Sequence, residues 1–87
     1  MYISPNPFII PDDDWVIIKN IPSGSSIKII TITGSLIKEI NLSSNESQAI
    51  WDGTDNQGNH VGTAVYLVSA HHPSKRNTVS KIAVIRK

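Results

Sequence analysis

The sequence predicts an all-β fold, a sandwich of two antiparallel sheets with about seven strands. Short apolar runs recur at regular intervals, and Gly, Pro, Asn, Asp or Ser bounds each of them, which is typical of strands and turns. No window of 11 residues shows sustained 3.6-residue periodicity, and Ile, Val and Thr are abundant, so helices are not expected. Seven short strands of this kind bury their apolar faces best as two packed sheets.

The first strands lie in a proline-rich segment. We expect a strand over residues 7–10, and because Pro7 and Pro11 bound it, we expect it at a sheet edge. A second strand follows over residues 15–19. The acidic run Asp12–Asp14 between them is interpreted as a solvated loop that keeps the edge strand from pairing with other molecules.

Residues 27–40 have the pattern of a β-hairpin. Apolar runs over 27–32 and 35–40 flank Thr33 and Gly34. A two-residue hairpin loop needs positive φ, which Gly34 adopts without strain. We therefore predict a two-residue loop at this position.

The second half begins with a short strand over 48–51, and a long polar loop then runs to about Gly62. The apolar residues of 63–72 point to both faces, which predicts a central strand. We expect a turn over 73–78 and a closing strand over 79–87, in which Ile82 and Val84 share a face.

The bulk properties suit one domain spanning residues 1–87 and exclude several functions. The net charge is +1, without the clustered basic face of a nucleic-acid-binding protein. The absence of cysteine excludes a thiolate nucleophile and a thiolate zinc site. No window approaches the roughly 20 apolar residues of a membrane helix, so membrane insertion is not expected.

The loop "WDGTDNQGN" contains the strongest candidates for a metal site. Oxygen atoms of Asp52, Asp55 and Asn56 are suitable ligands for calcium. The spacing does not match an EF-hand, in which acidic residues alternate and a Glu stands at position 12. Because Asp and Asn also stabilise turns, and Gly53 and Gly58 allow positive φ, we favour a purely structural loop. No cofactor is expected.

The remaining reactive residues do not form a catalytic pattern. His71 and His72 are adjacent and would face opposite sides of a strand, and His60 lies in a turn. There is no Gly-x-Ser-x-Gly motif, so we predict that the protein is not an enzyme. Trp51 is expected to anchor the core, and Trp15 to be half-buried near a sheet end, where a sugar-stacking role is the alternative.

Five short motifs occur in the order found in a known domain family. The chain resembles the immunoglobulin-like domain of the flagellar hook-capping protein, a pattern that recurs in C-terminal type A sorting domains of type IX secretion substrates in Bacteroidetes. The matching positions are Pro5, Asn6, Pro7, Gly34, Leu36, Ile37, Trp51, Asp52, Gly53, Gly58, Val65, Tyr66, Lys81, Ile82 and Val84. The family's Gly-Val-Tyr motif has Ala64 in place of glycine here.

The resemblance implies an immunoglobulin-like sandwich and a non-catalytic C-terminal sorting or accessory module of a longer protein that is secreted or displayed at the cell surface. The expected partners are secretion or assembly machinery proteins and the upstream domain of the same chain. Recognition would use strand addition at an exposed edge or the final strand, with Lys81, Ile82, Val84 and Arg86 as its recognition residues. The alternatives are a hook-cap-like scaffold or spacer, and a carbohydrate- or calcium-binding module.

Overall fold

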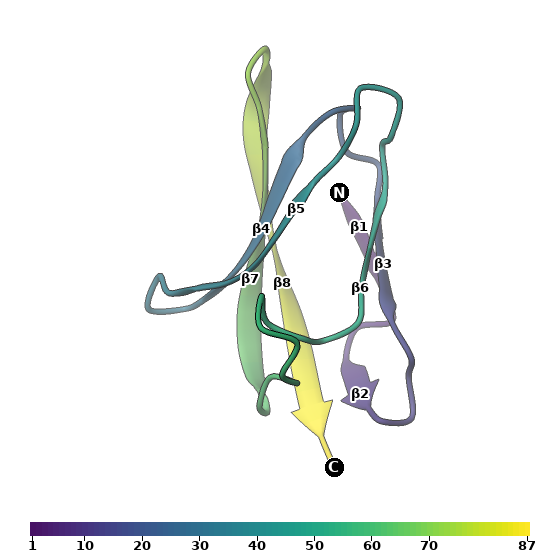
Figure 1. The fold of residues 1–87 in the computed structure, drawn as a ribbon, viewed down its shortest axis with the longest axis vertical. Helices are drawn as coiled ribbons and strands as arrows, with labels where there is room; N and C mark the ends of the chain where they lie inside the picture. Colours follow the sequence, from purple (N-terminus) through teal and green to yellow (C-terminus); the bar gives the residue numbers. More distant parts are fainter.

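The computed structural model describes residues 1–87 and confirms the all-β sandwich, with eight strands and no helix (Figure 1). The strands are β1 (Tyr2–Ser4), β2 (Phe8–Ile10), β3 (Val16–Lys19), β4 (Ser26–Thr31), β5 (Leu36–Asn41), β6 (Ala49–Trp51), β7 (Ala64–His72) and β8 (Lys75–Arg86). They form a three-stranded sheet of order β1-β3-β6 and a five-stranded sheet of order β2-β8-β7-β4-β5. No helix is present that could span a membrane.

The N-terminal segment differs from the expectation in two ways. The strand β1 was not predicted, because three residues before Pro5 are too few to show a period-two pattern. The strand β2 is an edge strand as predicted, but it runs parallel to β8, with Phe8 opposite Val84, so the sheets are not wholly antiparallel. The chain crosses from the three-stranded sheet to the five-stranded sheet between β1 and β2.

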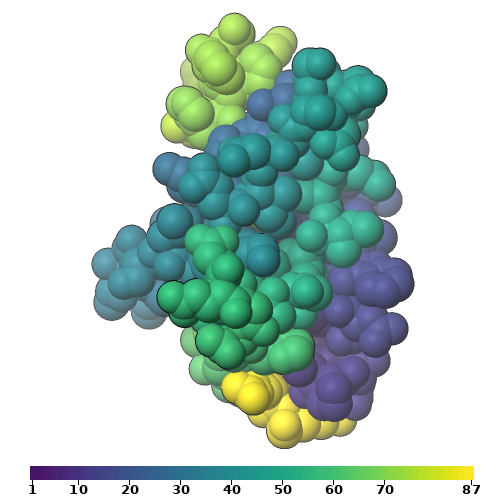
Figure 2. Space-filling view, in the orientation of Figure 1, coloured from purple at the N-terminus to yellow at the C-terminus, as the bar shows by residue number.

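Both hairpin turns differ from the predicted ones. The β4–β5 loop has three residues rather than two, since Thr31 N donates to Ser35 O (2.9 Å) and Gly34 N donates to Thr31 O (2.9 Å). This is the pattern of a turn followed by a bulge, in which Gly34 has φ +97°. The β7–β8 turn is confined to residues 73–74, because His72 already pairs with Lys75. Figure 2 shows both hairpin tips projecting from the body.

The core lies between the two sheets and contains 15 buried apolar residues. Its largest member is Trp51, from the three-stranded sheet, which packs against Phe8 and Tyr66 from the five-stranded sheet. The ring centroids lie 6.0 Å apart for Phe8–Trp51 and 6.2 Å apart for Trp51–Tyr66. Both separations are in the range of favourable aromatic pairs, so the predicted core role of Trp51 is confirmed.

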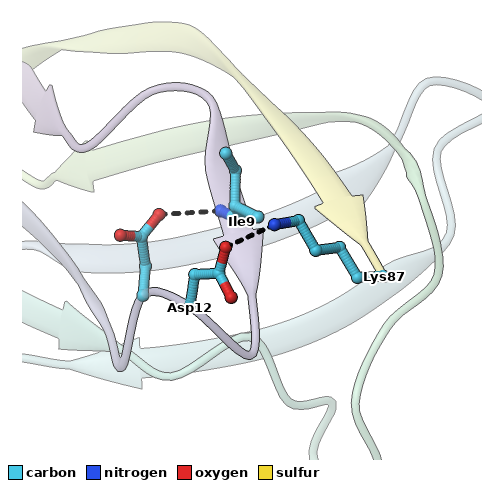
Figure 3. A network of polar contacts seen from close by, with 4 residues as sticks. Ile9, Asp12 and Lys87 are labelled. Atoms are coloured by element: carbon cyan, nitrogen blue, oxygen red, sulfur yellow. Dashed lines mark hydrogen bonds and ion pairs between the residues drawn. The ribbon is translucent and has the colours of Figure 1, made fainter.

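The outer edge of β2 is closed by the acidic run. Asp13 Oδ2 accepts a hydrogen bond from Ile9 N (2.9 Å), and Asp13 N donates to Ile9 O (2.7 Å). Asp13 therefore occupies both backbone groups of Ile9, as a neighbouring strand would. Asp12 forms an ion pair with Lys87 beside it (Figure 3). A capped edge cannot recruit another strand, which agrees with the interpretation of this run.

The burial pattern of β8 yields a test of the fold. Replacing Ile82, which is fully buried, by Ala should lower the free energy of unfolding by about 2–5 kcal/mol, because it leaves a cavity between the sheets. The matched change Val79→Ala lies on the same strand at a position that is 62% exposed, and should cost less than about 1 kcal/mol. Urea denaturation measures both; equal losses would contradict this placement of the strand.

Candidate recognition surface

The predicted recognition strand is not free. The strand β8 lies between β2 and β7 and is hydrogen-bonded to both. Ile82 and Val84 are buried in the core, whereas Lys81 and Arg86 are exposed. Over residues 84–86 a partner could therefore reach only the outward-facing side chains, and could not pair with the backbone without displacing β2 or β7.

The Pro-Asn-Pro motif holds β8 in place. Asn6 Nδ2 donates to Lys81 O (3.1 Å), and Ala83 N donates to Asn6 Oδ1 (3.1 Å). The Asn6 amide thus bonds the backbone of β8 at two positions, just before β2 begins at Phe8. The sequence placed Asn6 in a motif, but nothing local to that motif showed that its partner is 75 residues away.

The loop after Trp51 is a structural connection built from its own side chains. Trp51 Nε1 donates to Thr54 O (2.8 Å), and Asp52 Oδ1 accepts hydrogen bonds from both the backbone N–H and the hydroxyl of Thr54. The hydroxyl bond in particular holds the pKa of Asp52 below its ordinary value. The loop is thereby fixed directly to the largest core residue.

The second half of this loop is organised by Asp55, whose Oδ1 accepts from Gln57 N (2.9 Å) and Asn59 N (3.0 Å). Asn56 instead reaches β5, where its N–H donates to Ile37 O (3.0 Å) and its Oδ1 accepts from Glu39 N (3.3 Å). The side chains of the calcium candidates Asp52, Asp55 and Asn56 thus each accept hydrogen bonds from the backbone N–H groups of different residues. No cluster of three acidic or histidine side chains with the geometry of a metal site is formed.

Gly53 is required at its position for two reasons. Its φ is +82°, and a Cβ atom there would lie 2.8 Å from Ile10 Cδ1 and 2.9 Å from Phe8 Cε2. The loop therefore approaches β2 as closely as a bare backbone allows. Gly58 also has positive φ, +86°, but a Cβ there would meet nothing within 4 Å.

Tyr66 closes the same region from the other side. Its ring is buried against Trp51, and its Oη donates to Gly62 O (2.8 Å). Burial raises the pKa of this hydroxyl above its ordinary value. Tyr66 therefore packs in the interior of the sandwich.

The outer face of the five-stranded sheet carries an apolar surface. Because Tyr66, Val68, Ile82 and Val84 point inward, their neighbours in β7 and β8 point outward. The strand register aligns these with outward residues of β2, β4 and β5. We call the resulting set the outer apolar patch: Ile9, Ile30, Leu36, Val65, Leu67, Ala83 and Ile85.

The patch is accessible and continuous across the sheet. Leu36 is 47% exposed, Val65 44% and Ile85 41%, and the other members are partly exposed. In one row, Leu67 stands opposite both Ile30 and Lys81, and Ile30 stands opposite Leu36. A continuous apolar surface of this kind on a small domain is typical of an interaction site.

The other half of the same face is polar. A hollow of about 330 Å³ there is lined by Ser26, Lys28, Glu39, Ser69, His71 and Asn77. His71 Nδ1 is hydrogen-bonded to Asn77 Oδ1 (2.6 Å), and His72 Nδ1 accepts from Ser74 N (3.0 Å). These two histidines thus stabilise the β7–β8 hairpin.

The end of the sandwich near the C-terminal residue has a charged hollow of about 350 Å³. It is lined by Ile10, Pro11, Asp13, Asp14, Asp52, His60, Arg86 and Lys87. Arg86 Nη1 donates to His60 O (3.4 Å), so the charged Arg86 side chain also holds the loop that contains His60 to β8. Elsewhere, Trp15 is 50% exposed, which agrees with the predicted half-buried position, and sugar stacking on it stays a prediction.

The chain has a structural likeness to part of a longer protein of a secretion system. It is similar over 98% of its length, with TM-score 0.82 and 34% sequence identity, to part of a solved structure of PorZ from Porphyromonas gingivalis. PorZ is described as an essential bacterial surface component of the type IX secretion system. The chain spans 11% of that chain. No family model and no curated sequence matches.

This likeness supports a β domain related to type IX secretion, in agreement with the coarser part of the predicted resemblance. The finer prediction, an immunoglobulin-like domain of the hook-capping type with a sorting role, is not decided by it. The outer apolar patch was not identified from the sequence, although the alternating apolar residues of 63–72 did indicate a second apolar face on that strand.

The two loop glycines offer a matched test of the close approach to β2. Gly58→Ala should cost about 1–2 kcal/mol of unfolding free energy, from positive φ alone. Gly53→Ala causes the same backbone strain, and its Cβ would also clash with Ile10 and Phe8. Its loss of unfolding free energy should therefore be larger by at least about 1 kcal/mol. Chemical denaturation monitored by tryptophan fluorescence compares them. Equal costs would show that the loop does not pack on β2 as described.

Asp52 yields a pH-dependent prediction. Asp52→Ala should destabilise the fold by about 1 kcal/mol at pH 7, because two hydrogen bonds to a carboxylate are lost. The folded-state pKa is lowered, so this contribution is present above the ordinary aspartate pKa of about 3.9 and is lost as pH falls below it. The gap in Tm between the two proteins should narrow from pH 7 towards about pH 2. A constant gap would contradict the role assigned to Asp52.

Proposed function

We propose that this chain is a non-catalytic sorting or accessory module of a larger exported protein and that a type IX secretion machine recognises it. The observation that supports this most is the likeness to PorZ, which extends over nearly the whole chain at 34% identity. The sequence motifs point to the same class of domain independently of the overall fold. The module would be delivered to the cell surface or the medium with the protein that carries it.

The outer apolar patch is the surface that best suits recognition by the machine. It extends over five strands that are held by a common core, so it is presented rigidly. Preorganised apolar surface lowers the cost of binding. Lys81, an exposed member of the predicted recognition strand, pairs with Leu67 and lies at the border of the patch, where a charged rim is typical of interfaces.

An alternative is a spacer or scaffold role, in which the patch packs against a neighbouring domain of the same protein. The observation that favours it is that the similar region is 11% of the much longer PorZ chain. In that case the patch would be covered permanently, and its substitution would destabilise the joined domains rather than alter delivery.

The test is secretion of a reporter joined upstream of residues 1–87 in a bacterium with a type IX system. The patch variant Val65→Thr/Leu67→Thr/Ile85→Thr keeps β-branched or strand-compatible residues but makes the patch polar. Secreted reporter should fall about tenfold or more, which corresponds to about 1.4 kcal/mol of recognition energy. Truncating residues 81–87 is unsuitable, since it would remove the buried Ile82 and Val84.

The matched control is Val79→Thr, which replaces an exposed apolar residue outside the patch and should leave secretion unchanged. Thermal unfolding of each variant shows whether the domain itself is intact. Equal secretion by the patch variant would rule out the patch as the recognition surface. Equal secretion by a strain without a working type IX system would overturn the proposed function itself.

A further inference from the structure

The backbone of β5 has one side turned away from its sheet. Leu42 N donates to Ser25 O (3.0 Å), which shows that Leu42 faces β4. Because backbone groups alternate along an antiparallel strand, Ile40 also faces β4, whereas Glu39 and Asn41 face away. The hydrogen bond from Glu39 N to Asn56 Oδ1 confirms this direction.

Only part of this edge is capped. Asn56 covers Ile37 O and Glu39 N, much as Asp13 covers Ile9 on the opposite edge of the same sheet. No such hydrogen bond reaches the carbonyl of Glu39 or the backbone N–H and C=O of Asn41. The edge is therefore closed over its first half and open over its second half.

A groove lies beside the open half. Its volume is about 550 Å³, and its wall is formed by residues 40–42 of the β5 end and residues 45–50 of the following loop and β6. These two strands belong to different sheets, and the connection between them arches from one layer to the other (Figure 1). The apolar side chains in the wall are Ile40, Leu42, Ala49 and Ile50.

We propose that this edge of β5 binds an extended peptide segment of a partner protein as an added strand. The open groups of Glu39 and Asn41 have strand spacing, which a partner backbone satisfies and a small ligand does not. Side chains on one face of the added strand would enter the groove and contact its four apolar side chains, so the segment has apolar residues at alternate positions.

The charge of the groove defines the segment further. Glu46 is the one charged residue in its wall, and its carboxylate accepts a hydrogen bond from Ser43 N (2.8 Å). Glu39 lies opposite Lys28 on the outer face of the sheet, so Glu46 alone sets the charge of the groove. A segment with Lys or Arg at its ends is therefore favoured. A second copy of this chain is disfavoured as the occupant, because the open half of its own β5, residues 39–41, has no basic side chain to complement Glu46.

The experiment measures fluorescence anisotropy with a labelled synthetic heptapeptide that has lysine at both ends and valine at alternate positions. The full chain should bind it with a Kd below about 1 mM, as expected for a short strand addition. The same peptide with alternate backbone nitrogens methylated keeps its side chains but loses backbone N–H donors. Its affinity should be lower by about tenfold or more. Equal binding of the two peptides, or none by either, overturns the proposal.

The variant pair Asn41→Pro and Asn41→Ala tests the site on the protein. Both remove the side chain that accepts from Ser26 Oγ, but only proline removes the outward N–H, and proline is tolerated at a strand edge. Asn41→Ala should bind the first peptide normally, and Asn41→Pro about tenfold more weakly.

Amide NMR shifts of the unmodified chain provide a readout that does not depend on the variants folding. Peptide addition should perturb Asn41 and its neighbours rather than the outer apolar patch. Shifts confined to the patch would overturn the peptide assignment. So would concentration-dependent dimerisation that, without peptide, protects the Asn41 N–H from hydrogen exchange with solvent. Because no arm measures secretion, failure here is separate from failure of the proposed function.

Discussion

The structure depends on one aromatic contact between its two layers. Trp51 belongs to the small sheet, whereas Phe8 and Tyr66, which flank it, belong to the large one. An 87-residue domain buries limited apolar area, so a large shared side chain at the centre has a strong effect on stability. The long loop after Trp51 depends on it as well, since the indole N–H binds Thr54 O and Gly53 lies directly against Phe8 and Ile10.

A second feature is the use of polar side chains in place of missing backbone partners. Asn6 bonds β8, Asp13 bonds β2, and Asn56 bonds β5, and each of them occupies both an N–H and a C=O group with its own amide, carboxylate or backbone atoms. In a small sandwich with short strands, many strand-edge groups would otherwise be exposed. These three residues therefore hold β8, β2 and β5 in place and limit pairing of their edges with strands of other molecules.

Two of the surfaces that stay open differ in kind. The outer apolar patch is a side-chain surface on rigid strands, and the free half of the β5 edge is a backbone surface beside a groove of mixed polarity. The first suits a folded partner and the second an extended one. The domain can therefore discriminate between a folded partner and an extended one.

Much of the fold followed from the sequence alone. Period-two patterning and punctuation by Gly and Pro are local properties, so they indicated the all-β class, most strands, the edge position of β2, and the turn roles of Gly34, Asp52 and Asp55. The residue type of Trp51 also indicated that it belongs to the core.

Only the tertiary structure decided which strands are neighbours, because pairing joins residues that are far apart in the chain. It placed β8 beside β2 in parallel, buried Ile82 and Val84, and brought Asn6 to β8. It also aligned outward side chains of five strands into one patch, and left the end of β5 uncapped. The sequence determined what each segment could become, whereas long-range register determined which of its atoms remain available to a partner.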